Sequence, residues 1–368
     1  MSKKCKFARD FLLFSAVPLA ALGASERSFA ADARPTIAKD WVQVNALTLD
    51  SYKKDFDKWS WVPKIDFRVF GPIPSGAQLY LDFNIPGAGS VKFDCPTQEL
   101  VKGRYLDLRC GGRDVPEEKS TQYTGKVSFA IKMRNELNNT DVALFNGKMT
   151  VDKLKSNEHG PQAANKFVFY VDDDWNLPIG YLYLTQDDIR NWDLPRFHAS
   201  FWVRGDDGSF EPHIFFNGKE VGKIAMQGMQ VGQASCDSEV EKQTNQSVDD
   251  SIPQKAKWTR MHCDFPNVVA WNKVKDGTGL DSMFVFAKNP GNYELKILWQ
   301  NHLARSIKFS VTADGRFDNG VATSNNLGDD RVIVPVQILG DQDGKWNKSA
   351  WKSDAFYGNP LNGFKAVQ

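Results

Sequence analysis

The chain has 368 residues, of which 41% are hydrophobic, 12% aromatic and 25% charged. This composition excludes a disordered or collagen-like chain, and the length is sufficient for about two domains. The 46 basic residues are balanced by 45 acidic ones, so no excess of positive charge favours a nucleic-acid partner.

The first thirty residues have the pattern of a secretory signal peptide. Lys3, Lys4 and Arg9 precede an apolar stretch at 11–24, and small residues follow in Ser28-Phe29-Ala30. This apolar stretch is too short to cross a bilayer of about 30 Å as a helix. We therefore predict a cleaved signal peptide at 1–30, a secreted or periplasmic location, and no transmembrane segment in the mature chain.

The mature chain keeps four cysteines: Cys95, Cys110, Cys236 and Cys263. An even number of cysteines in an exported chain predicts two disulfides. None of them lies in a C-x-x-C pair, and no histidine follows at metal-ligand spacing. Zinc binding and thioredoxin-like chemistry are therefore disfavoured.

Several features recur in the same order in two halves of the chain, which predicts a diverged tandem duplication. The repeat predicts domains at 31–174 and 175–345, with a C-terminal extension at 346–368. It also favours one disulfide within each copy, Cys95–Cys110 and Cys236–Cys263, over pairing between the copies. The matched features are Trp41 and Trp175, Leu47–Leu49 and Leu182–Leu184, Trp59 and Trp192, Phe67–Phe70 and Phe201–Val203, Val127–Ile131 and Met283–Phe286, Met149–Val151 and Phe309–Val311, and Phe167–Val171 and Val332–Val336.

The hydrophobic pattern indicates an all-β chain. Val127, Phe129, Ile131 and Met133 alternate with more polar residues, the period of a strand with one buried face. Asn-Gly pairs at 146–147 and 217–218 predict tight hairpin turns. Many short strands separated by turn residues favour two tandem antiparallel β-sandwiches, Ig-like or jelly-roll-like. The C-terminal extension is expected to cover the second domain or to dock a partner as a strand.

No catalytic motif is present, and no catalytic residue is predicted. The five histidines lie outside recognisable motifs, and there is no G-x-S-x-G or H-E-x-x-H sequence. Glu211 and His213 share one strand face and could form an acid–base pair, but a polar strand surface is the favoured interpretation.

Acidic runs at the ends of the two copies are the best metal candidates. Carboxylates and loop carbonyls are the oxygen ligands that Ca²⁺ prefers. The alternative is that these residues form solvated turns. The candidate ligands are Asp172, Asp173, Asp174, Asp341 and Asp343.

Eleven tryptophans raise the hypothesis of glycan binding, because aromatic faces stack on sugar rings. Trp41, Trp175, Trp59 and Trp192 recur in both copies, which favours packing. The candidates for a binding role are Trp258, Trp271, Trp346 and Trp351, for which core packing is the alternative.

The sequence thus predicts a non-enzymatic, exported binding or structural protein whose ligand is a glycan or another protein. The main alternative is a secreted hydrolase that acts on polysaccharide through acidic residues at a loop rim. A third possibility is an accessory pair of domains within a larger secreted complex.

Overall fold

Strands make up most of the chain, which confirms the predicted all-β class. In the described part of the chain, helical segments have five residues or fewer. The computed structural model describes residues 34–52, 55, 58–96, 105–112, 115–157, 166–186, 195–205, 208–222, 234–242, 253–271, 283–318, 320–327 and 331–367. The predicted signal peptide lies outside these residues. Within them, no helix has the length and hydropathy needed to cross a membrane.

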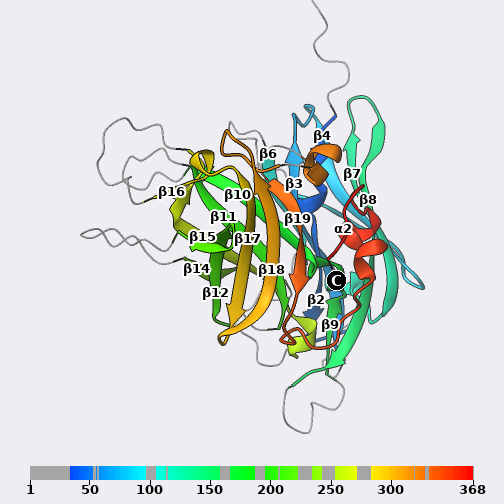
Figure 1. The fold of residues 1–368 in the computed structure, drawn as a ribbon. Helices are drawn as coiled ribbons and strands as arrows, with labels where there is room; N and C mark the ends of the chain where they lie inside the picture. The colour runs from blue at the N-terminus through cyan, green and yellow to red at the C-terminus, as the bar shows by residue number, and fades with distance from the viewer. Residues whose placement is uncertain are drawn as a thin grey trace, which may run out of the picture. The chain divides into compact units, whose positions relative to one another are not determined.

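The first half of the chain forms two antiparallel sheets (Figure 1). In the first sheet β3 (Ser60–Phe70) pairs on one edge with β1 (Thr36–Ile37) and β2 (Gln43–Leu49), and on the other with β6 (Tyr105–Gly111). The second sheet has the order β5-β4-β7-β8-β9. Its strands are β4 (Ala77–Ile85), β5 (Gly89–Asp94), β7 (Gly125–Asn135), β8 (Thr140–Lys155) and β9 (Phe167–Val171).

The predicted alternation in β7 is confirmed, because Val127, Phe129, Ile131 and Met133 are all buried in the first core. The predicted turn at Asn146-Gly147 is wrong, since both residues lie inside β8. Gly147 pairs with Phe129, and a Cβ atom at this position would overlap the Phe129 ring. The glycine thus permits close packing. At Asn217-Gly218 both φ angles are positive, and the predicted hairpin is confirmed.

The second half forms a closed barrel of eight strands instead of the predicted open sandwich. The ring has the order β11-β10-β19-β18-β17-β12-β14-β15 and closes through pairing of β15 with β11. Side chains of a second core fill the interior, as expected for a barrel of this size. The strands are β10 (Ile179–Gln186), β11 (Pro195–Arg204), β12 (Phe210–Phe216), β14 (Ser235–Lys242), β15 (Trp258–Val269), β17 (Gly291–Trp299), β18 (His302–Val311) and β19 (Arg331–Ile338).

The remaining elements are short. Strand β13 (Lys219–Val221) pairs with β12, and β16 (Phe284–Val285) runs parallel to β15. The helices are α1 (Gly320–Ser324) and α2 (Ala355–Gly358), and the 3₁₀ turns are η1 (Lys39–Trp41), η3 (Glu117–Lys119), η5 (Asp174–Asn176), η6 (Gln254–Ala256), η7 (Phe286–Lys288) and η8 (Ala350–Lys352).

The two halves share one order of strand pairing. The path β2-β3-β6 corresponds to β10-β11-β15, and β5-β4-β7-β8-β9 corresponds to β14-β12-β17-β18-β19. A 3₁₀ turn with a tryptophan, Trp41 or Trp175, precedes each copy. One predicted match is wrong, because the counterpart of β7 is β17, whereas Met283–Phe286 contributes β16 and the start of η7.

The halves differ at two places, here called seams, where the three-strand path of each half meets its five-strand path. In the barrel, β14 pairs with β15 and β19 pairs with β10, which closes the ring. At the matching places of the first half, no strand pairing joins β5 to β6 or β9 to β2 among the described residues. There the Cys95–Cys110 disulfide links the end of β5 to β6, and the Phe169 N–H donates to the Thr48 hydroxyl at 2.9 Å.

Both predicted disulfides are confirmed. Cys95 pairs with Cys110, and Cys236 pairs with Cys263. Cys236 and Cys263 lie directly opposite each other on β14 and β15, so this disulfide occupies the seam that corresponds to the first one. The two disulfides lie at matching positions because the two halves share one strand order.

The C-terminal segment was predicted to cover the second domain or to dock a partner. In the structure it packs mainly on the first half, and it also contacts the second, where Asn362 and Asn325 hydrogen-bond to each other. Phe356, Tyr357, Leu361 and Phe364 belong to the first core cluster, which is built mostly from the first two sheets, and α2 lies against β8 (Figure 1). The Tyr357 hydroxyl accepts a hydrogen bond from the Val44 N–H at 2.7 Å. This segment therefore completes the first core.

Candidate functional site

The tryptophans that recur in both copies were predicted to pack inside the protein, and most of those in the described residues do so. Trp59 and Trp175 are buried in the first core, and Trp192 lies outside the described residues. The Trp41 ring lies between the guanidinium groups of Arg68 and Arg331, each 3.4 Å from the ring centroid. Stacked cation–π contacts of this kind stabilise the position of the ring.

The tryptophans predicted to bind a glycan do not form an exposed strip. Trp258 is fully buried, and its ring packs against Tyr170 and the Arg204 guanidinium. It therefore has no face that a sugar could reach, which corrects the prediction for this residue. Trp271, Trp346 and Trp351 are half-buried; Trp346 and Trp351 pack against the first core, and Arg316 lies over the Trp271 ring.

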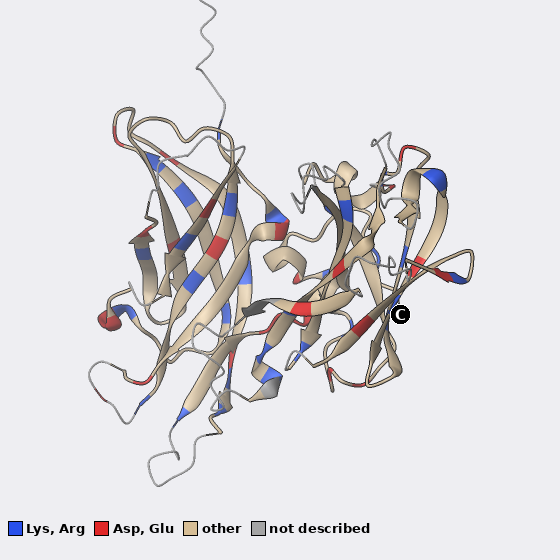
Figure 2. Cartoon of the chain, turned by 90° about the vertical axis from the view of Figure 1, so that its left-hand side faces the viewer, with Lys and Arg blue, Asp and Glu red and all other residues tan. Residues whose placement is uncertain are grey.

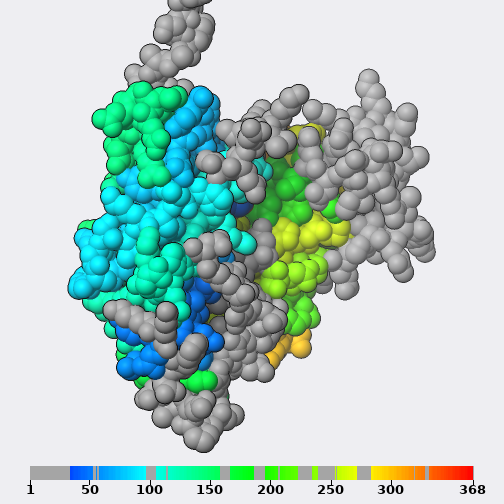
Figure 3. All heavy atoms as spheres, turned by 180° about the vertical axis from the view of Figure 1, so that it is seen from behind, coloured from blue at the N-terminus to red at the C-terminus, as the bar shows by residue number. Residues whose placement is uncertain are grey.

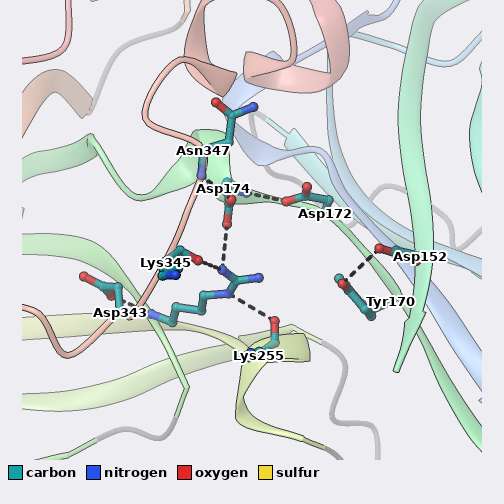
Figure 4. Close-up of polar contacts among 9 residues, drawn as sticks. Asp152, Tyr170, Asp172, Asp174, Lys255, Asp343, Lys345 and Asn347 are labelled. Carbon is teal, nitrogen blue, oxygen red and sulfur yellow. Dashed lines mark hydrogen bonds and ion pairs between the residues drawn. The ribbon is translucent and has the colours of Figure 1, made fainter. Parts of the chain in front are cut away.

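The two acidic runs predicted to bind calcium meet around an arginine (Figure 4). The Arg204 Nη1 atom lies 3.6 Å from Asp174 Oδ1, and the Arg204 backbone N–H donates to Asp343 Oδ1 at 2.9 Å. The Arg204 guanidinium also donates to the carbonyl oxygens of Lys255 and Lys345. Arg204 thus links the two runs, with its guanidinium beside Asp174 and its backbone N–H on Asp343.

The other predicted metal ligands also have protein partners or face solvent. Asp172 accepts a hydrogen bond from the Asp174 N–H, and Asp173 accepts one from the Trp175 indole. Asp343 forms a buried ion pair with Arg305, and Asp341 is exposed. Among the described residues, no group of three or more His, Cys, Asp or Glu side chains could hold a metal ion. The predicted calcium ligands are therefore mostly committed to protein donors.

Replacing Asp174 with asparagine is expected to raise the unfolding midpoint at pH 7. Burial raises the pKa of Asp174 above its usual 3.8, and the nearby Asp172 and Asp343 carboxylates raise it further. The native state therefore binds this proton more tightly than the unfolded state, and stability is lost as pH rises through the native pKa. Asparagine resembles the neutral form, so its advantage in urea unfolding should vanish below pH 3.8.

Asp314→Asn is the matched control, because the pKa of Asp314 is shifted in the opposite direction to that of Asp174. A hydrogen bond from Thr312 lowers the pKa of the exposed Asp314 carboxyl. This variant should gain no stability at pH 7. An Asp174→Asn midpoint that is lower than that of the unsubstituted chain at pH 7 would contradict the assigned cost of the buried charge.

A groove of about 540 Å³ lies on the outer face of the second sheet, where the C-terminal segment meets it. Because side chains alternate along strands, the polar residues of β4, β7 and β8 face outwards here while their neighbours enter the core. We call this site the sheet groove. Its lining residues are Asp82, Asn84, Ser128, Phe129, Ala130, Lys132, Asn146, Gly147, Lys148, Ser353, Tyr357, Gly358 and Asn359.

An ion pair between two lining residues is the main fixed polar feature of the groove. Phe129 and Gly147 also line the groove, but the Phe129 ring is 3% exposed and packs in the first core. Lys132 Nζ lies 2.8 Å from Asp82 Oδ2. Burial raises the pKa of Asp82, but hydrogen bonds from Lys132 and Ser90 outweigh it and lower the pKa overall. Asp82 is therefore ionised at neutral pH.

The rim of the groove is held by the C-terminal segment. The Asn359 side chain donates to the Asn146 carbonyl oxygen at 3.0 Å and to the Phe356 carbonyl oxygen at the same distance. Asn84, Ser128, Asn146 and Lys148 are exposed, so their amide, hydroxyl and ammonium groups are accessible from solvent.

Sequence reasoning did not find this groove. The Asn-Gly pair that forms part of it gives the same signal as a hairpin turn, and Asn359 is 213 residues from its partner Asn146. The alternation of β7 was the one local signal that placed Ser128 and Lys132 on an outer face. Comparisons with protein-family models, curated proteins and solved structures found no match to this chain.

Proposed function

We propose that this chain is an exported binding protein whose ligand is a saccharide, and that the sheet groove is the binding site. The observation that carries the proposal is the groove itself, with a volume inside the range of about 300–1,000 Å³ that ligand pockets have. The two disulfides are compatible with an oxidising, extracellular location.

The chemistry of the lining suits sugar hydroxyl groups. Each hydroxyl both donates and accepts hydrogen bonds, and the groove offers amides, a hydroxyl, a carboxylate and ammonium groups. Basic and acidic residues are interspersed along the strands in Figure 2, which favours a neutral ligand over a polyanion.

The groove does not favour the hydrolase alternative. Glycoside hydrolysis normally requires two carboxyl groups, one of them a general acid with a raised pKa. Asp82 is the one carboxylate among the lining residues, and its pKa is lowered. Binding without bond cleavage therefore fits this site better.

A protein ligand is also less favoured. Apolar docking surfaces are contiguous patches. The large apolar side chains that are exposed in the described part of the chain lie on separate elements: Tyr105, Leu137, Leu303, Leu339 and Val367.

The shared strand order of the two halves supports the proposal that a gene duplication produced them.

A glycan array probed with the purified chain, followed by calorimetry on the best ligand, tests the proposal. The double variant Asn84→Ala and Asn146→Ala should weaken binding at least tenfold, because two hydrogen bonds of about 1 kcal/mol each are lost. The control is Asn292→Ala, an exposed asparagine on β17. A silent array, or equal affinities for the two variants, would overturn the proposal.

A further inference from the structure

A second group of polar side chains lies on the outer face of the barrel, on three adjacent strands. Thr185 is on β10, His198 on β11 and Asp264 on β15. The β11–β15 register places His198 directly opposite Asp264. In Figure 3 the green and yellow-green surface of the barrel strands lies recessed beside the blue and cyan surface of the first half.

These three residues form a hydroxyl–imidazole–carboxylate series. Thr185 Oγ1 lies 2.6 Å from His198 Nε2, and His198 Nδ1 lies 3.5 Å from Asp264 Oδ1. In the tautomer with its proton on Nδ1, His198 has Nε2 free to accept the hydrogen bond of the threonine hydroxyl. This is the order of a nucleophile, its general base and the group that orients the base. The longer second distance is typical of such sites before substrate binds.

Two aromatic side chains hold the imidazole in place. His198 is only 5% exposed, and its ring stacks on Tyr183 and on His262, with centroids 5.4 Å and 5.1 Å away. The Tyr183 hydroxyl is 2.6 Å from His262 Nδ1, which fixes these two rings relative to each other. The His198 side chain is therefore buried and oriented, whereas Thr185 and Asp264 keep partial exposure.

A cation lies beside the Asp264 carboxylate, on the residue paired with Thr185. Arg196 is directly opposite Thr185 in the β10–β11 register, and its Nη1 atom is 3.7 Å from Asp264 Oδ2. The β11–β15 pairing shifts register between Arg196 and Phe197. Such irregularities re-aim side chains and are frequent beside active sites. A guanidinium here would stabilise an oxyanion that develops near Thr185.

We propose that this cluster is an acyl-ester hydrolase centre, with Thr185 as nucleophile and His198 as general base. Thr185 Oγ1 attacks the ester carbonyl carbon while its proton passes to His198 Nε2. The tetrahedral adduct collapses to an acyl-threonine ester, and the leaving alcohol takes the proton from His198. A water molecule then attacks the acyl carbon while one of its protons passes to His198 Nε2. His198 returns this proton to Thr185 Oγ1 as the acyl–Oγ1 bond breaks, which releases the carboxylic acid and regenerates both residues. Asp264 is a positioning residue.

A second histidine of the barrel provides an internal comparison. His213 Nδ1 lies 2.6 Å from Glu220 Oε1, but its Nε2 faces Glu211 Oε2 at 4.0 Å. The nearest partner of Nε2 is thus a carboxylate and not a hydroxyl, so this histidine has no nucleophile to activate. His213 is the matched control for His198.

The test uses the full chain, with p-nitrophenyl acetate as substrate and a fluorophosphonate probe whose attachment site is mapped by peptide mass spectrometry. The probe should label Thr185. Thr185→Val should abolish labelling and lower the hydrolysis rate at least 100-fold, and Thr185→Ser should restore both. His198→Asn should lower the rate similarly. His213→Asn and Thr140→Val, which removes an exposed hydroxyl, should leave the rate unchanged.

The pH profile separates this role from a structural one. The rate should rise as His198 loses its proton, and this rise should be absent in Thr185→Val. Labelling at another residue, or equal rates in Thr185→Val and Thr140→Val when both unfold like the unsubstituted chain, would overturn the proposal. Saccharide binding in the sheet groove involves other residues and should be unaffected by Thr185→Val.

Discussion

Replacing Arg305 with methionine should lower the free energy of unfolding by about 3–5 kcal/mol, measured by guanidinium chloride denaturation at pH 7. Arg305 and Asp343 form an ion pair at 2.6 Å, and Arg305 is completely buried. The guanidinium also donates to the Ala304 and Trp202 carbonyl oxygens. Removing it leaves a buried carboxylate without its main counter-charge, and the desolvation cost of that carboxylate is no longer offset.

Arg316→Met is the matched control, because Arg316 pairs with Asp314 while both side chains are about two-thirds exposed. Exposed ion pairs contribute about 0–1 kcal/mol, so this variant should be nearly neutral. Adding Asp343→Leu to Arg305→Met should recover part of the lost stability, because no unpaired buried charge remains. Equal losses for Arg305→Met and Arg316→Met would show that the buried pair has no special role.

The strand pattern of this chain was readable from its sequence because burial leaves a local trace. The alternation at Val127, Phe129 and Ile131 records one apolar face, and the matched positions of Cys95–Cys110 and Cys236–Cys263 record the repeat. Both signals depend only on neighbouring residues or on the order of motifs. Neither depends on how the sheets close.

Closure of the barrel has no corresponding signal in the local sequence. A strand with one apolar face has the same period in a sandwich and in a barrel, so the two are distinguished only by long-range pairing. The barrel closes where His198 on β11 meets Asp264 on β15, 66 positions later in the chain. The first half has the same strand order, and there the seams between β5 and β6 and between β9 and β2 are not hydrogen-bonded as strands.

The candidate sites were only partly predictable for the same reason. Composition identified Asp174 and Asp343 as functional or structural carboxylates, but nothing near Arg204 in the sequence shows that it lies between them. The calcium ion predicted for these carboxylates is a different interpretation from the Arg204 contacts that the structure shows. Thr185 and His198 carry no motif, because their contact follows from strand register.

Tyr357→Ala should lower the free energy of unfolding by about 3–5 kcal/mol, the range observed when a large aromatic side chain is deleted from a core. The Tyr357 ring is 1% exposed and contacts the rings of Phe129 and Trp175, which belong to β7 and η5. Phe356 and Tyr357 both have positive φ values, a conformation that non-glycine residues adopt only where surrounding contacts stabilise it. Loss of the ring should therefore release the C-terminal segment from the first core.

Tyr357→Phe separates the ring from the hydroxyl group. It keeps the packing but leaves the buried Val44 N–H without its acceptor, a cost of about 1–3 kcal/mol. Tyr105→Phe, at a side chain that is 44% exposed, should be neutral within about 0.5 kcal/mol. If Tyr357→Phe also proved neutral, the Val44 N–H would have to be satisfied in another way. If Tyr357→Ala were neutral, the C-terminal segment could not be part of the first core, because a packed ring cannot be removed without leaving a cavity.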